Sequence, residues 1–176
     1  MRIIAGEYRG RQINAPDSSR PTLDRVRENL FNILGPSIRG ARVLDLFGGS
    51  GALGIEAISR GATADICDID SGAIKMIRAN LSLLKATAGV YHIDYKRYLE
   101  NTSNTYDYIF VDPPYESEYI VDILNIVKDR GLLNSGGVIV YEHSSDKKVN
   151  IDVEGYFVKD TRKYGHATLT FIKEDL

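Results

Sequence analysis

The tetrapeptide Asp112-Pro113-Pro114-Tyr115 carries the most specific chemical signal in the sequence. Two consecutive prolines fix φ and remove two N–H donors, so the segment is stiff and presents carbonyl oxygens. An amine on an aromatic base is a poor nucleophile because its lone pair is delocalised into the ring. The Asp112 carboxylate and the Pro113 carbonyl can accept both amine hydrogens and aim that lone pair, while Tyr115 stacks on the base. The pattern predicts a site that activates an exocyclic amine on a base that has left its stack.

A glycine-rich turn follows an apolar run within residues 43–54. Its glycines allow the backbone to approach a ligand, and the turn satisfies the G-x-G-x-x-G pattern of dinucleotide sites. Asp45 comes directly before the turn, where its carboxylate would repel a pyrophosphate but suits a cationic ligand end. The amino group and sulfonium of S-adenosylmethionine meet that requirement. We therefore predict this cofactor, with Phe47, Gly49 and Gly51 as contacts from the turn.

Two further acids end the next two predicted strands. Asp68 can accept hydrogen bonds from both ribose hydroxyls, and Asp94 can accept one from the exocyclic amine of adenine. Ile69 can pack on the adenine face. For each acid the alternative is a structural role as a helix N-cap, and for Asp70 we favour the cap.

Alternating strands and helices must position these residues. Strands are expected at residues 42–47, 64–68, 90–94, 108–112 and 137–142, and an antiparallel pair near 156–159 and 167–172. Amphipathic helices are expected up to residue 60, at 71–84 and around 120–127. This alternation predicts an α/β fold with a mostly parallel sheet and helices on both faces. Ligands bind such sheets at the carboxyl ends of the strands, where the acids fall.

The N-terminal region is expected to be a small hairpin over residues 2–14 and an amphipathic helix from Leu23 that Gly35-Pro36 ends. Residues 1–27 carry six arginines against three acids, a net charge of +3, whereas the whole chain carries −2. A basic end on an acidic body predicts a local phosphate-binding face. A solvated surface that merely uses arginine is the alternative.

The sequence gives little support for a membrane-spanning protein, a secreted protein or a metalloprotein. No apolar run approaches the roughly 20 residues that span a bilayer, and the first residues do not form a signal peptide. Cys67 is the single cysteine, so we expect no internal disulfide, a core position for Cys67 and a cytoplasmic protein. Three dispersed histidines predict no metal site.

The chain resembles the RsmD family, class I S-adenosylmethionine-dependent enzymes that methylate guanine N2 in 16S rRNA. The resemblance runs from Ile3 to about Ile172. Both loops carry it, together with three other segments: Arg2–Gly6 with Arg9-Gly10-Arg11, the Arg-Pro-Thr block Arg20–Leu34, and Tyr164-Gly165 before a final strand. It implies a Rossmann-like, seven-stranded sheet with a reversed last hairpin. It also implies that Asp112–Tyr115 hold the guanine amine and that Asp45, Gly49, Gly51, Asp68 and Asp94 are cofactor positions. Asp68 stands where relatives often carry Glu, and the shorter side chain reaches the ribose less well.

The resemblance divides the chain into a basic extension, residues 1–35, and a methyltransferase domain, residues 36–176. The family has no separate target-recognition domain, so the extension is the expected rRNA contact. The candidate contacts are Arg9, Arg11, Arg20, Thr22 and Arg25. The expected partner is 16S rRNA in the small ribosomal subunit or an assembly intermediate. We expect a monomer and no membrane contact.

Other functions remain open. The same chemistry could act on adenine N6 in DNA or RNA, or on a glutamine amide in a protein. A nicotinamide-dependent oxidoreductase would use Gly49–Gly54 and Asp68. It would leave Asp45 and Asp112–Tyr115 without a role, and a non-catalytic RNA-binding module would need neither loop.

Overall fold

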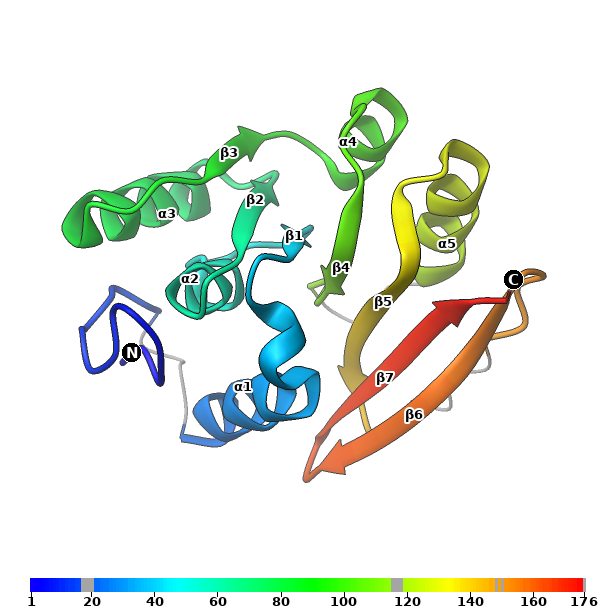
Figure 1. Ribbon diagram of the computed structural model, residues 1–176, viewed down its shortest axis with the longest axis horizontal. Helices are drawn as coiled ribbons and strands as arrows, with labels where there is room; N and C mark the ends of the chain where they lie inside the picture. Colours follow the sequence, from blue (N-terminus) through cyan, green and yellow to red (C-terminus); the bar gives the residue numbers. More distant parts are fainter. Residues whose placement is uncertain (17–20, 115–118, 148, 150, 176) are drawn as a thin grey trace.

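Seven strands form a single sheet in the computed structural model, which describes residues 1–16, 21–114, 119–147, 149 and 151–175. The elements are α1 (Pro21–Leu34), η1 (Gly35–Ile38), β1 (Arg42–Asp45), α2 (Ala52–Ser59), β2 (Thr63–Asp68), α3 (Ser71–Leu84), β3 (Gly89–His92), α4 (Tyr95–Asn101), β4 (Tyr106–Val111), α5 (Tyr119–Arg130), β5 (Leu133–Ser144), β6 (Tyr156–Tyr164) and β7 (Ala167–Glu174). The strand order is β3-β2-β1-β4-β5-β7-β6 (Figure 1). Strands β1 to β5 are parallel, and β7 is antiparallel to both β5 and β6. The predicted mostly parallel sheet is confirmed.

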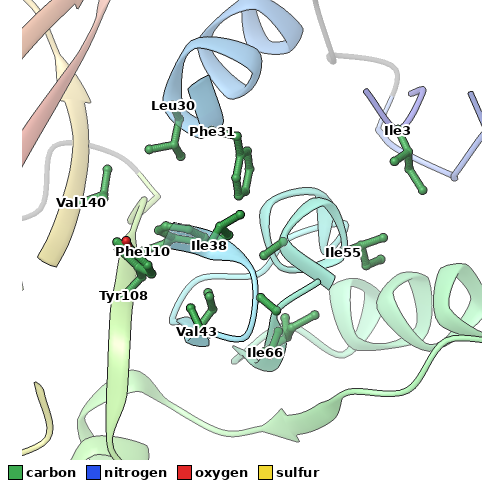
Figure 2. Packing of buried hydrophobic residues seen from close by; sticks show 14 of the residues in the cluster. Ile3, Leu30, Phe31, Ile38, Val43, Ile55, Ile66, Tyr108, Phe110 and Val140 are labelled. Atoms are coloured by element: carbon green, nitrogen blue, oxygen red, sulfur yellow. The ribbon is translucent and has the colours of Figure 1, made fainter. Parts of the chain in front are cut away.

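Helices cover both faces of the sheet. Successive residues of a strand point to opposite sides, so both faces carry apolar side chains that a helix can cover. Val43 packs in one hydrophobic cluster with residues of α1, α2 and α3, and Figure 2 shows part of this cluster. Leu44, the next residue, packs in a second cluster with residues of α4 and α5. The central strands are therefore buried on both faces, as parallel strands usually are.

The N-terminal segment, residues 1–16, packs against α2 and α3 (Figure 1). The predicted hairpin is confirmed: Arg2 and Gln12 form an antiparallel bridge, and the Ile3 N–H donates to the Arg11 carbonyl oxygen at 2.9 Å. Much of its backbone bonding goes to other elements: the Ala5 N–H bonds to Glu56 on α2, and Asn14 exchanges two hydrogen bonds with the Asn80 side chain on α3. These tertiary bonds hold the hairpin against α2 and α3.

The elements differ from expectation by one additional turn, one additional helix and one earlier strand start. The predicted end of the first helix is confirmed, because α1 ends at Leu34, but Gly35-Pro36 also opens η1, where a proline near the start removes an N–H that needs no partner. A short helix, α4, was not predicted, and Asp94 caps it by accepting from the Lys96 N–H at 3.2 Å. Strand β5 begins at Leu133, earlier than expected, since Leu133 already pairs with Tyr106 of β4.

Candidate functional site

A cavity of about 640 Å³ opens beside the carboxyl ends of β1 and β4. These two strands are neighbours in the sheet, although β2 and β3 lie between them in sequence, so the cavity lies at the point where the strand order reverses. Such a crevice is the usual ligand site of an open α/β sheet. Its wall contains nine of the predicted site residues: Asp45, Phe47, Gly49, Asp68, Ile69, Asp94, Asp112, Pro113 and Pro114. The structure thus brings both predicted loops to one cavity.

The glycine turn is held by hydrogen bonds to the acids around it. Gly51 has φ of +84° and precedes the first residue of α2; it turns the chain rather than contributing to the cavity wall. Gly49, with φ of +59°, has open space where a Cβ would lie and donates its N–H to Asp68 at 2.9 Å. An exposed N–H-rich turn before a helix is suited to hold a ligand.

Asp45 is buried at the end of β1, where one carboxylate oxygen accepts from the Gly54 N–H at 3.1 Å. Burial, with a smaller contribution from the charge of Asp68, raises the pKa of Asp45 to about 7, against a lowering by the Gly54 bond. A cation in the cavity would stabilise the ionised form of this carboxylate. The position therefore favours a positively charged ligand group.

Asp68 already supports the fold. Its two oxygens accept from the N–H groups of Gly49 and Asp70, each at 2.9 Å, and each oxygen retains a further lone pair. Asp70 caps α3 by accepting from the Ala73 N–H at 2.8 Å, which confirms its predicted role. Ile69 is 68% exposed, although it is strongly apolar, and its surface contributes to the cavity.

Two tyrosines that the sequence did not reveal, Tyr95 and Tyr119, join the predicted Phe47 in the cavity wall. Phe47 stacks on Tyr119 with 6.2 Å between ring centroids, and Tyr95 contacts both rings. The Tyr95 hydroxyl donates to Asp122 at 3.0 Å, which fixes the ring. Asp94 lines the same region next to Tyr95. These residues come from three elements, so no local sequence pattern could group them.

Asp112 and Glu142 form a carboxyl pair at the ends of β4 and β5. Val111 pairs with Tyr141 in the sheet, which places the two following residues side by side. Asp112 is accessible from the cavity, yet the surrounding protein and then the neighbouring Glu142 raise its pKa well above the usual range. Burial also raises the pKa of Glu142. Such coupled acids are typical of sites that accept or share protons.

The predicted RNA contacts are only partly described. Arg9 and Arg25 are exposed. Arg11 is also exposed, and its guanidinium donates to the Leu83 carbonyl oxygen near the end of α3 at 3.1 Å. Arg20 and Tyr115 lie outside the described residues, as does the side chain of Thr22.

Several remaining expectations concern absences or core positions. Cys67 is buried, which confirms its core position, and burial raises the pKa of its thiol. Among the described residues, no group of His, Cys, Asp or Glu side chains is arranged to hold a metal ion. In the same part of the chain, no helix combines the length and apolar character needed to span a membrane.

Known proteins share both the sequence and the fold. A family model described as Conserved hypothetical protein 95 matches residues 1–173. Ribosomal RNA small subunit methyltransferase D of Escherichia coli (strain K12) is 41% identical over 146 residues, covering 81% of this chain and 74% of that protein. The solved structure of yhhF from Escherichia coli has a TM-score of 0.89 at 32% identity and covers 100% of this chain and 98% of that one. A T. thermophilus 16S rRNA N2 G1207 methyltransferase (RsmC), in complex with AdoMet and guanosine, has a TM-score of 0.75 at 22% identity, covering 93% of this chain and 45% of that one.

Proposed function

Because the chain belongs to the RsmD family, whose model carries the description Conserved hypothetical protein 95, we propose that it methylates the N2 amine of a guanine in small-subunit rRNA. The family predicted from the two loops and the Arg-Pro-Thr block is confirmed. The protein is an S-adenosylmethionine-dependent rRNA methyltransferase. Guanine as the target base and N2 as the acceptor atom are the proposal.

The cavity residues fit S-adenosylmethionine. The buried carboxylate of Asp45 suits the cationic methionine end, and Asp68 retains lone pairs for ribose hydroxyls. The exposed side chain of Ile69 and the ring of Phe47 offer apolar surface to the adenine, with Asp94 in the same wall to accept from its amine. When bound, this cofactor supplies an electrophilic methyl group on its sulfonium.

Asp112 and Pro113 orient the acceptor amine. The carboxylate and the proline carbonyl accept its two hydrogens, which aims the nitrogen lone pair toward the methyl group, and proximity supplies much of the rate. After transfer, the nitrogen carries an extra proton. Asp112 can take this proton, because its pKa is raised above that of an ordinary carboxyl group.

The observation that carries the choice of guanine is the carboxyl pair of Asp112 and Glu142 in one cavity. A guanine that has left its stack presents two neighbouring donors on its Watson–Crick edge, N1–H and the N2 amine. Two neighbouring carboxyl groups offer acceptor oxygens that match these donors. Adenine presents an acceptor at N1, which would leave Glu142 opposite a lone pair, and such repulsion discriminates between bases.

We further propose where the enzyme acts. Residues 1–35 would contact rRNA through their exposed arginines, on the assembled or assembling small subunit, with the protein acting as a monomer. A ribosomal substrate places this reaction in the cytoplasm. The support is the basic N-terminal region together with the rRNA methyltransferase relative.

The decisive experiment is transfer of labelled methyl groups to unmethylated small subunits, with naked rRNA and duplex DNA in parallel. The modified nucleoside is then identified by mass spectrometry. We expect N2-methylguanosine from rRNA, and a loss of roughly a hundredfold or more in the Asp112→Ala variant. Asp129→Asn, which changes an exposed acid on α5, should retain the wild-type rate.

A second variant tests how the site recognises the base. Glu142→Met keeps the size of the side chain but removes the acceptor, so transfer to guanine should fall by about tenfold to a hundredfold. If N6-methyladenosine were the main product, guanine would be wrong as the target base, but methyl transfer to an exocyclic amine would stand. Label found only on protein would overturn the nucleic-acid substrate.

A further inference from the structure

Arg27 is a buried arginine in the wall of the cofactor cavity. Its side chain lies on α1 and is only 4% exposed. Nη2 donates to the Arg2 carbonyl oxygen at 2.6 Å and to the Asp24 carboxylate at 3.3 Å. Considering the described residues, Nε and Nη1 have no hydrogen-bond partner. Buried donors without partners are costly, especially on a charged group, so these two nitrogens indicate a missing acceptor.

The charges around Arg27 leave an excess of positive charge. Glu56 is fully buried and accepts from Arg60 at 2.9 Å, whereas its distance to Arg27 Nε is 4.0 Å. Asp24 is 50% exposed, so solvent weakens its attraction. Two guanidinium groups thus share one buried carboxylate. Burial lowers the pKa of Arg27, and the charges of Glu56 and Asp24 oppose this change, which also fits a site that lacks an anion.

We propose that Arg27 binds the methionine carboxylate of S-adenosylmethionine through its free nitrogens. This inference rests on the proposed function, since it assumes that the cofactor occupies the cavity. Arg27 shares the cavity wall with Ser50 and with Ala52, the first residue of α2, whose helix N-terminus also favours an anion. The planar fork of a guanidinium matches a carboxylate. An RNA phosphate is the other candidate anion, but a guanidinium buried in the cavity wall favours a small ligand that enters the cavity.

The test compares two ligands that differ in one group. Calorimetry measures the binding of S-adenosylmethionine and of decarboxylated S-adenosylmethionine, which keeps the nucleoside, sulfonium and amine. The proteins are the wild type, Arg27→Met and Arg27→Lys, with Arg78→Met as a matched control that changes an exposed arginine on α3. Thermal unfolding of each variant establishes that it is folded.

The wild type should bind S-adenosylmethionine roughly tenfold to a hundredfold more tightly than the decarboxylated compound. Arg27→Met should lose most of this difference without weakening the decarboxylated compound, Arg27→Lys should retain part of it, and Arg78→Met should retain all of it. A wild type that binds both equally would overturn the inference even if Arg27→Met does not fold, as would an Arg27→Met variant that weakens both ligands equally. A wild type that binds neither ligand would instead overturn the proposed function itself.

Discussion

Asp45 links cofactor binding to pH. Its pKa of about 7 means that the carboxylate is only partly ionised near neutrality, whereas a cationic ligand requires the ionised form. The affinity for S-adenosylmethionine should therefore rise as the pH increases from 6 to 7.5, by roughly fivefold to tenfold, in proportion to the ionised fraction. Binding near pH 6.5 should also release a proton, which calorimetry in buffers of different ionisation enthalpy measures. Asp45→Asn should bind weakly and show little pH dependence, and a flat wild-type profile would contradict this role for Asp45.

The pair of Asp112 and Glu142 makes a separate pH prediction. Asp112 must be ionised to accept hydrogens from the amine, so methyl transfer should increase with pH. The surrounding protein and the neighbouring Glu142 raise the pKa of Asp112, so the rise should occur above the ordinary carboxyl range of about 4. Glu142→Gln removes the like charge and lowers this pKa, which should move the acidic limb of the single-turnover rate to lower pH. The exposed Glu154→Gln change is the control, and a limb that stays in place would show that Glu142 does not control this titration.

The N-terminal segment contacts the end of α2 at a position where any side chain would clash with the backbone. Gly6 has φ of +88°, and a Cβ there would lie 1.9 Å from the Ser59 carbonyl oxygen. Gly6→Ala should therefore displace the segment and lower the free energy of unfolding by about 2 kcal/mol or more. Affinity for S-adenosylmethionine should fall as well, because Met1 and Pro16 of the segment line the cavity.

Gly10→Ala is the matched variant, because it places a side chain on a backbone with positive φ without causing a clash. Gly10 has a similar φ of +82°, but no atom lies within 4 Å of its Cβ position. This change should cost only about 1 kcal/mol, the usual penalty for a side chain in the left-handed region. Chemical denaturation of both variants gives the comparison. Equal losses would mean that the contact with Ser59 does not hold the segment.

Local patterns predicted the elements that bury apolar residues at regular spacing, and with them the acids that follow the strands. They could not predict α4, since its seven residues show no clear apolar stripe. Nor could they identify Arg27 as a site residue, because its neighbours in the cavity lie far away in sequence. Asn80 illustrates the limit: it is fully buried and joins Asn14 to Ser50, partners that lie 66 and 30 residues away. Its sequence context is that of an ordinary helix position.

The distribution of charge over the molecule separates cofactor binding from RNA binding. The cofactor cavity contains the acids Asp45, Asp68, Asp94 and Asp112, which would repel a phosphate backbone. The exposed Arg25 lies on α1 between Leu23 and Val26, which line this cavity. Arg11 instead contacts Leu83 near the far end of α3. A polyanion held at α1 would therefore meet the cavity at its edge, and only the extruded base would need to enter.

Replacing Arg9 and Arg11 by Ala tests whether the N-terminal segment also contacts rRNA. Each phosphate contact releases counterions, so loss of two contacts should weaken rRNA binding and reduce the slope of log affinity against log salt by about 1 to 2. Affinity for S-adenosylmethionine should not change, because neither arginine lines the cavity. Filter binding at several salt concentrations measures the slope. The control replaces Lys159 and Lys163 on β6, two exposed cations at the opposite edge of the molecule, and should leave the slope intact. If the lysine variant lost the slope and the arginine variant kept it, rRNA would contact the β6 edge, and the N-terminal segment would serve the cofactor cavity alone.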